Sequence, residues 1–257
     1  MDETAELIAL SGRALVAMMS GAPGFELRMM RGCTLGLSGE DLADLNMLLI
    51  GPDPEGEAFL VSSLARVAER GLPLLVMLTP DVADALGPAA ERLGLMAAGT
   101  APLMVLRADT PVSPSRPCEI RQALDPEMVK IAGDLSAAAF ELPREAVARS
   151  MDVGLTATAA LETWVGSSGD GPMSAVTVTR AGPTAGIWTM ATPPEHQGKG
   201  MGRALLTRII ADYRQAGVER FFLVATEAGR PLYESIGFEA VADLSMWVMG
   251  HSTQVHT

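Results

Sequence analysis

A glycine-rich hexapeptide, Gln197-Gly198-Lys199-Gly200-Met201-Gly202, carries the strongest chemical signal in the chain. It lies between a predicted strand and a predicted helix that begins at Met201. Glycines let a backbone bend tightly and approach a ligand, and the amide N–H groups at a helix N-terminus converge on an anion. Lys199, one of only two lysines in the chain, and Arg203 add positive charge beside it. The pattern indicates a site for phosphate or pyrophosphate.

The spacing of this glycine loop does not fit two common nucleotide-binding motifs. It matches neither the Gly-x-Gly-x-x-Gly of dinucleotide-binding folds nor the Gly-x-x-x-x-Gly-Lys-Ser/Thr of triphosphate-binding loops. A glycine turn that merely joins the strand to the helix is the alternative from these residues alone. The neighbouring elements must therefore discriminate between the two readings.

A proline-rich linker at residues 109–117 divides the chain, because its closely spaced prolines block both helix and sheet hydrogen bonding. We expect an N-terminal domain at residues 1–108, a C-terminal domain at residues 118–250, and a polar tail at residues 251–257. Before the linker, the patterns predict helices at 3–19, 57–70 and 81–93 and strands at 33–37, 45–50, 72–78 and 103–106. After it, they predict strands at 119–123, 163–166, 175–179, 186–192, 221–225 and 245–249 and helices at 126–140, 143–151, 201–216 and 231–235.

Helices fall between strands throughout, which predicts an α/β fold with a mixed central sheet flanked by helices. The two halves share one order of elements. In each half, a strand, a loop and a long helix come first, and a buried strand follows them. A helix and a last strand come after this buried strand, which lies at 74–78 in the first half and at 221–225 in the second. We interpret this as a divergent internal duplication. The alternative is a pair of unrelated α/β segments.

Residues 118–250 resemble the GNAT superfamily of acyl-CoA-dependent N-acyltransferases. The segment Trp188–Gly202 is similar to the family's cofactor-binding strand and pyrophosphate loop. About thirty residues later, Gly229–Phe238 resembles its second signature, a tyrosine four residues before Gly-Phe. The order and spacing of the two segments make the combination more specific than either one.

The resemblance implies a role for each part of this region, with acetyl-CoA as the acyl donor and no metal. Backbone groups of Met190, Ala191 and Thr192 would contact the pantetheine arm and stabilise the oxyanion formed at the thioester. Tyr233 would protonate the departing thiolate, since a phenol of pKa about 10 stays protonated at neutral pH. The alternative for Tyr233 is a packed ring with its hydroxyl in solvent. The pyrophosphate would be bound by Gln197, Gly198, Lys199, Gly200, Met201, Gly202 and Arg203.

Two departures from the family pattern affect the expected site. Thr226 and Gly229 stand where members often carry asparagine and alanine, and the strand 186–192 has no carboxylate or histidine to act as a general base. The candidate bases elsewhere are Glu162, Glu195, His196 and Glu227. Water, or an amine that arrives neutral, is an equal alternative.

The corresponding loop of the first half, residues 51–57, is unsuited to a pyrophosphate. Its three carboxylates would repel the anion, and its two prolines have no N–H group to donate to it. Ala90 stands at the position that matches Tyr233. We therefore expect a degenerate N-terminal domain that packs on the active one.

The composition narrows the class of partner. The chain has 257 residues, 48% of them apolar, and a formal net charge of −12. This charge argues against nucleic acid or an anionic membrane as a partner, and no apolar run is long enough to span a bilayer. The acidic N-terminus and two cysteines without metal or redox spacing indicate a cytoplasmic protein.

The expected function is direct transfer of an acetyl group from acetyl-CoA to an amine through a tetrahedral intermediate. The acceptor would be a small molecule or a peptide. The alternative is a non-catalytic acyl-CoA-binding or regulatory module. The sequence alone leaves the acceptor, the acyl-chain preference and the oligomeric state open.

Overall fold

The computed structural model describes residues 2–113, 115–150 and 161–250. The chain divides into two compact units. Unit 1 comprises Met1–Leu103 with Ala240–Thr257, and unit 2 comprises Met104–Glu239. The boundaries fall inside strands β5 (Met96–Leu106) and β11 (Glu239–Met249). Almost all of the last strand of the chain therefore belongs to the unit that contains the first residues.

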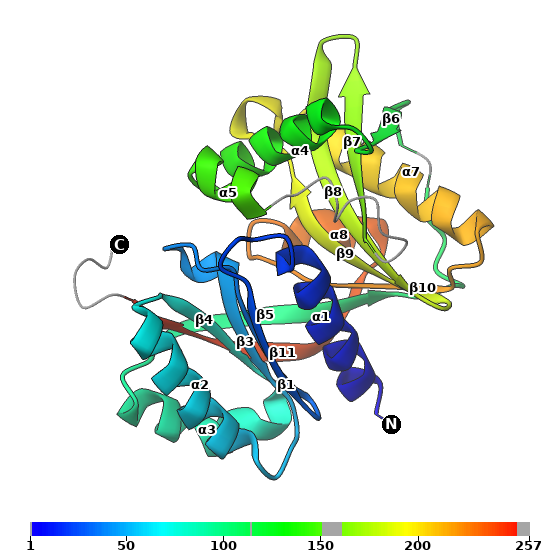
Figure 1. Cartoon of the computed structure of the whole chain (residues 1–257). Helices are drawn as coiled ribbons and strands as arrows, with labels where there is room; N and C mark the ends of the chain where they lie inside the picture. The colour runs from blue at the N-terminus through cyan, green and yellow to red at the C-terminus, as the bar shows by residue number, and fades with distance from the viewer. Residues whose placement is uncertain (1, 114, 151–160, 251–257) are drawn as a thin grey trace. The chain divides into compact units, whose positions relative to one another are not determined.

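Unit 1 has a mixed sheet with helices on both faces (Figure 1). Its strands are β1 (Glu26–Met30), β2 (Cys33–Leu37), β3 (Asn46–Ile50) and β4 (Leu74–Leu78), followed by β11. Pairings β1/β2, β2/β3 and β4/β11 are antiparallel, and β3/β4 is parallel. A short 3-10 turn, Ala43–Leu45, precedes β3, and the helices are α1 (Glu3–Met19), α2 (Gly56–Arg70) and α3 (Pro80–Arg92). Leu60 of α2 and Leu86 of α3 pack with Leu35 of β2 in one buried core.

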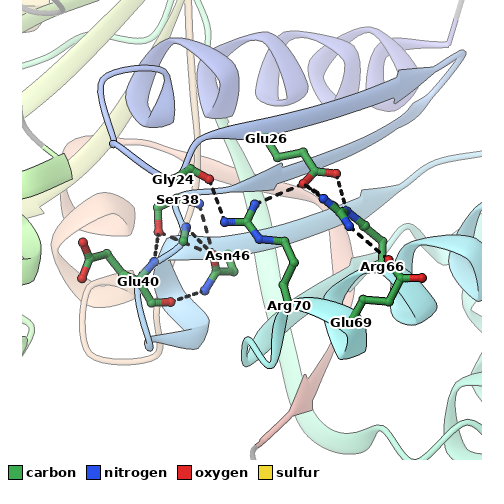
Figure 2. A network of polar contacts seen from close by, with 9 residues as sticks. Gly24, Glu26, Ser38, Glu40, Asn46, Arg66, Glu69 and Arg70 are labelled. Atoms are coloured by element: carbon green, nitrogen blue, oxygen red, sulfur yellow. Dashed lines mark hydrogen bonds and ion pairs between the residues drawn. The ribbon is translucent and has the colours of Figure 1, made fainter.

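A group of ion pairs fastens α2 to the edge strand β1 in unit 1 (Figure 2). Arg66 donates to Glu26 through Nε at 2.8 Å, and Arg70 donates to the same carboxylate at 3.1 Å. Arg70 also donates to the Gly24 carbonyl. Hydrogen bonding from Arg66 is the main reason why the pKa of Glu26 lies below its ordinary value. The cluster anchors an edge strand that has a sheet partner on only one side.

Unit 2 has a mixed sheet of the same kind. Its strands are β6 (Glu119–Gln122), β7 (Leu161–Ser168), β8 (Gly171–Ala181), β9 (Thr184–Ala191) and β10 (Arg220–Val224), next to the end of β5. Pairings β6/β7, β7/β8 and β8/β9 are antiparallel, and β9/β10 is parallel. The helices are α4 (Pro126–Ala139), α5 (Arg144–Ser150), α7 (Met201–Gln215) and α8 (Arg230–Ile236), with a 3-10 turn at Pro194–His196.

Two helices cover opposite faces of the unit 2 sheet (Figure 1). Val176 of β8 packs with the buried residues of α7, whereas its neighbour Ala175 packs with α4. Successive side chains of a strand point to opposite faces, so this division identifies the face on which each β8 residue lies. The Asp125 side chain caps α4 by accepting the Met128 amide at 2.8 Å.

The expected α/β fold is confirmed. In each unit, four consecutive strands are paired in the order antiparallel, antiparallel, parallel, and these are β1–β4 in unit 1 and β7–β10 in unit 2. Three features differ most from what the sequence predicts. Strand β1 was not predicted, and β5 begins at Met96 rather than at residue 103. The last strand, expected to complete the domain at 118–250, instead pairs with β4 in unit 1, where Trp247 packs against Gly87. The expected tail at 251–257 lies outside the described residues.

The described residues contain neither a membrane-spanning helix nor a side-chain cluster suited to a metal ion. None of the helices there is long and apolar enough to cross a membrane. Likewise, the described ranges contain no group of three or more His, Cys, Asp and Glu side chains that could hold a metal ion.

Candidate functional site

Strand β9 departs from regular geometry near its end. The pairing between β8 and β9 shifts register between Ala175 and Thr177, so that Thr189 and Met190 together oppose Val176 alone. Thr189 has a φ of +43°, in the left-handed region that a β-branched residue rarely adopts. This is a β-bulge, which interrupts the ladder and leaves backbone groups without a partner strand.

The end of β9 also parts from β10. The parallel pairing covers Thr184–Gly186 and Arg220–Phe222, whereas β9 continues to Ala191 and β10 to Val224. Two parallel strands that stop pairing before they end leave unpaired backbone donors and acceptors between them. We call this unpaired stretch at the carboxyl ends of the two strands the slot.

The glycine loop follows directly and leads into α7. Gly198 and Gly200 have φ values of +71° and +75°, which glycine adopts without steric cost, and Gly200 is the residue that precedes the helix. The Gln197 side chain donates to the Thr192 carbonyl at 3.0 Å and so ties the loop to the end of β9. The first turn of α7 has no acidic residue. Its free amides and the helix dipole favour an anion here.

Gly202 brings the start of α7 against the end of β9. A Cβ atom at Gly202 would lie 2.9 Å from Thr192 Oγ1, 3.4 Å from Met190 Cε and 3.8 Å from Leu232 Cδ2. The Thr192 hydroxyl is itself hydrogen-bonded to Ser174 at 3.1 Å. There is no room for a side chain at this position, and its absence lets β9, α7 and α8 meet.

Tyr233 lies on α8 with its ring in the hydrophobic core of unit 2. Its side chain is 8% exposed, and the ring contacts Phe238 edge-on with centroids 5.8 Å apart. A Cβ atom at Gly229 would lie 3.0 Å from this ring, so glycine there makes space for it. Burial raises the pKa of Tyr233 to about 12, which keeps the phenol protonated at neutral pH. Within the described ranges the structure gives its hydroxyl no hydrogen-bond partner.

The cationic side chains near the loop differ in what they contact. Lys199 is exposed, and Arg203 donates to the Ser235 carbonyl of α8 at 3.0 Å. Arg116, in the linker, donates to the Lys199 carbonyl at 2.8 Å. Arg116 carries no sequence signal for this contact, because only the folded chain brings the linker to the loop.

Replacement of Arg116 by alanine removes this hydrogen bond from the loop. We expect the dissociation constant for CoA to rise about threefold, because a charged contact at an exposed position contributes about 0.2–1 kcal/mol. Isothermal titration calorimetry measures it. Arg121→Ala on β6 removes the same charge outside the loop, and equal losses in both variants would contradict a specific role for Arg116.

Residues 160–240 match the family model described as acetyltransferase (GNAT) domain. The chain carries a GNAT acetyltransferase domain. The matched segment contains the bulge in β9, the glycine loop, α7, α8 and Tyr233.

Solved structures of GNAT proteins have the same fold over almost the whole chain. A GCN5-related N-acetyltransferase from Kribbella flavida is 15% identical, with 98% of each chain covered and a TM-score of 0.72. One from Sphaerobacter thermophilus is 14% identical, covering 88% of this chain and 79% of that chain, with a TM-score of 0.61. A tandem GNAT protein from the clavulanic acid biosynthesis pathway is 15% identical, covering 98% and 94%, with a TM-score of 0.59. At these identities the likeness concerns the fold.

Glu162, one of the candidate bases in the GNAT domain, is engaged elsewhere. The Tyr213 hydroxyl donates to its carboxylate at 2.5 Å and accepts from Trp164 Nε1 at 3.0 Å. Tyr213 lies near the C-terminal end of α7, whereas the glycine loop lies at the N-terminal end. Burial, and then the bond to Glu162, raise the pKa of Tyr213 above its ordinary value. Glu162 therefore belongs to a partly buried polar cluster of the GNAT domain.

Loss of the Tyr213 hydroxyl tests this cluster. In Tyr213→Phe the Trp164 N–H and the Glu162 carboxylate both lose their partner, so we expect the free energy of unfolding to fall by about 1–3 kcal/mol. Urea denaturation measures it. Unchanged stability would show that the two groups find water instead.

The remaining base candidates give no single choice. Glu195 and Glu227 are exposed, and His196 is half-buried with an Nδ1 atom that has no partner among the described residues. Thr226, at the position where asparagine was expected from the resemblance, accepts the Gly229 amide at 3.1 Å. Its hydroxyl thus closes the turn that leads into α8.

The first half lacks both departures from regular strand geometry. The parallel pairing of β3 with β4 extends to Ile50 and Leu78, and the Thr79 amide then donates to the Ile50 carbonyl at 3.0 Å. The pairing of β2 with β3 shows no register shift. Ala90, which stands opposite Tyr233 in the alignment of the halves, is fully buried. The counterpart of the slot is closed by backbone hydrogen bonds.

Proposed function

We propose that the GNAT domain transfers the acetyl group of acetyl-CoA to an amine. The observation that carries this proposal is the combination, in one unit, of a bulged and splayed β9, a helix N-terminus behind a glycine loop, and a buried protonated tyrosine on the adjoining helix. Each feature supports a different part of one reaction. Together they favour a ligand-binding glycine loop over a glycine turn that only joins β9 to α7.

The binding of CoA divides between two sets of backbone groups. The amides of Gly198, Lys199, Gly200, Met201 and Gly202, with the side chain of Gln197 and the charge of Arg203, bind the pyrophosphate. The pantetheine arm lies in the slot between β9 and β10 and forms hydrogen bonds with the main-chain groups of the two strands, as an additional β-strand would. Met190, Ala191 and Thr192 then lie at the level of the thioester.

The chemical step needs one bond formed, one broken and two proton transfers. The amine nitrogen bonds to the carbonyl carbon, and the carbon–sulfur bond breaks. Amides of Met190 and Ala191 stabilise the negative charge that develops on the carbonyl oxygen. Tyr233 donates its proton to the thiolate and is reprotonated from solvent, and water takes the proton of an amine that does not arrive neutral.

The acceptor we propose is an amine of a small molecule or a peptide. The formal net charge of −12 favours a cationic acceptor over an anionic one. The same balance of charge argues against nucleic acid and anionic membranes as partners, and we place the reaction in the cytoplasm.

We further propose that the N-terminal half binds no CoA, which makes it a degenerate relative of the GNAT domain. Its strands stay paired where β9 and β10 separate, and its loop carries Asp53, whose carboxylate accepts the Glu55 amide at 2.8 Å. A carboxylate that occupies the loop amides competes with a phosphate for the same donors. The expected stoichiometry is one CoA per chain.

Calorimetry and turnover measurements on the chain of 257 residues test the proposal. Binding of acetyl-CoA and CoA is titrated first, and release of free thiol from acetyl-CoA is then followed against a library of primary amines. Turnover with binding of one CoA per chain supports the enzyme. Binding without turnover supports the alternative, a non-catalytic acyl-CoA-binding or regulatory module, and absence of binding overturns both.

A further inference from the structure

A row of three threonine hydroxyls crosses the unit 2 sheet at the bulge. Thr189 Oγ1 donates to Thr177 Oγ1 at 2.9 Å, and Thr177 Oγ1 lies 3.1 Å from Thr163 Oγ1. The three residues come from β9, β8 and β7 in order across the sheet. Thr163 and Thr177 are 2% and 4% exposed, so water does not compete for these bonds. Within the described ranges, neither hydroxyl bonds to a side chain outside the row.

The bulge is what places Thr189 in this row. Thr177 lies on the sheet face covered by α4, because its neighbours Val176 and Val178 pack with α7 on the other face. Trp188 is paired with Thr177, and its indole donates to Thr179 on that same face. In a regular strand the next residue, Thr189, would point to the opposite face. Its φ of +43° turns its hydroxyl back to Thr177.

The backbone of Thr189 needs this support. Positive φ is adopted readily by glycine and sometimes by asparagine or aspartate, whose side chains compensate locally, but a β-branched residue is strained there. Strain of this kind persists only where the surroundings hold it. The hydrogen bond to Thr177 is the contact in the structure that joins the Thr189 side chain to the neighbouring strand.

We propose that Thr177, held in turn by Thr163, is a positioning residue that fixes the bulge and thereby the amides of Met190 and Ala191. The proposal rests on the proposed function, in which those amides stabilise the thioester oxyanion. Thr177 does not touch the substrate. It acts through Thr189, and it differs from the glycine loop in that it affects the chemical step and leaves the pyrophosphate site unchanged.

The first test is Thr177→Val, which keeps the shape of the side chain and removes the hydroxyl. Without its acceptor, Thr189 relaxes toward negative φ and the following amides shift. We expect kcat to fall about tenfold while the dissociation constant for CoA stays within about twofold. Thr177→Ser, which keeps the hydroxyl, should retain most of the activity. Thr34→Val, the same replacement of a buried strand threonine in unit 1, is the control.

The second test is rescue by glycine. Because glycine adopts positive φ without help, Thr177→Val combined with Thr189→Gly should recover kcat to within about threefold of Thr189→Gly alone. A merely structural role for Thr177 predicts no such recovery, since the second change restores no packing. Equal kcat in Thr177→Val and wild type, or additive losses in the double variant, would overturn the proposal.

A measurement of the bulge itself separates this proposal from the proposed function. The NMR Cα and Cβ chemical shifts of Thr189 report its φ angle in wild type, Thr177→Val and Thr177→Ser. We expect these chemical shifts to change in Thr177→Val and to stay at their wild-type values in Thr177→Ser. If they change but the wild type shows no turnover, the proposed function fails and the role of Thr177 in the bulge stands. If they do not change, the role of Thr177 is wrong even in an active enzyme.

Discussion

Replacement of Tyr233 by phenylalanine should lower kcat about 100-fold, the size of effect that loss of a general acid typically has. The dissociation constant for CoA should stay within about twofold, because the groups proposed to bind the pyrophosphate and the pantetheine arm do not include the phenol. Stability should not fall, since the hydroxyl of Tyr233 has no protein partner among the described residues. Steady-state kinetics with acetyl-CoA and a turned-over amine, together with calorimetry, measure both quantities.

The chain offers a matched control, because Tyr213 is its other tyrosine. Tyr213→Phe removes a hydrogen-bonded hydroxyl from the opposite end of α7, so it should lower stability and leave kcat within about twofold. Tyr233→Phe is therefore expected to lower kcat without a loss of stability, and Tyr213→Phe to lower stability without a loss of kcat. With a pKa of about 12, Tyr233 also stays protonated in the wild type up to about pH 11. Wild-type activity in Tyr233→Phe would show that the thiolate leaves without this acid.

Replacement of Gly202 by valine should raise the dissociation constant for CoA at least about tenfold. Its Cβ atom alone would lie 2.9 Å from Thr192 Oγ1, and the two methyl groups need further space. The start of α7 must therefore move away from the end of β9, which carries the loop amides out of register with the slot. Calorimetric titration with CoA measures the loss.

The matched control for this variant is Gly169→Val in the turn between β7 and β8. A Cβ atom at Gly169 meets no atom within 4 Å, so the same substitution has room there. We expect its CoA affinity to equal that of the wild type. A folded Gly202→Val protein that binds CoA normally would show that the contact between α7 and β9 does not shape the site.

The sequence alone predicts the elements and site residues whose pattern lies within one short segment of the chain. The pattern at 3–19 predicted α1 with the bounds it has, and the pattern at 201–216 predicted α7 to within one residue. Both rely on helical periodicity and on glycines at the ends. The loop residues and Tyr233 could be chosen because their spacing repeats a family pattern, and the structure then placed Gly202, Met190 and Thr192 in contact.

The sequence was insufficient where a partner strand decides the structure. The early part of β5, from Met96, is rich in alanine and glycine, which have little intrinsic preference for strands. The bulge at Thr189 has no sequence signal, because threonine is an ordinary strand residue and its partner Thr177 comes from another strand. Glu162 was a possible base until the fold placed it beside Tyr213.

The order in which the ribosome releases the chain matters for a protein connected in this way. β4 pairs with β11 through Leu78 and Ser245, which lie far apart in the sequence. The sheet of unit 1 therefore stays incomplete until residues 245–249 have been synthesised, and until then the apolar edge of β4 is exposed. Nascent chains of this protein consequently depend on protection from aggregation longer than chains whose first domain closes on itself.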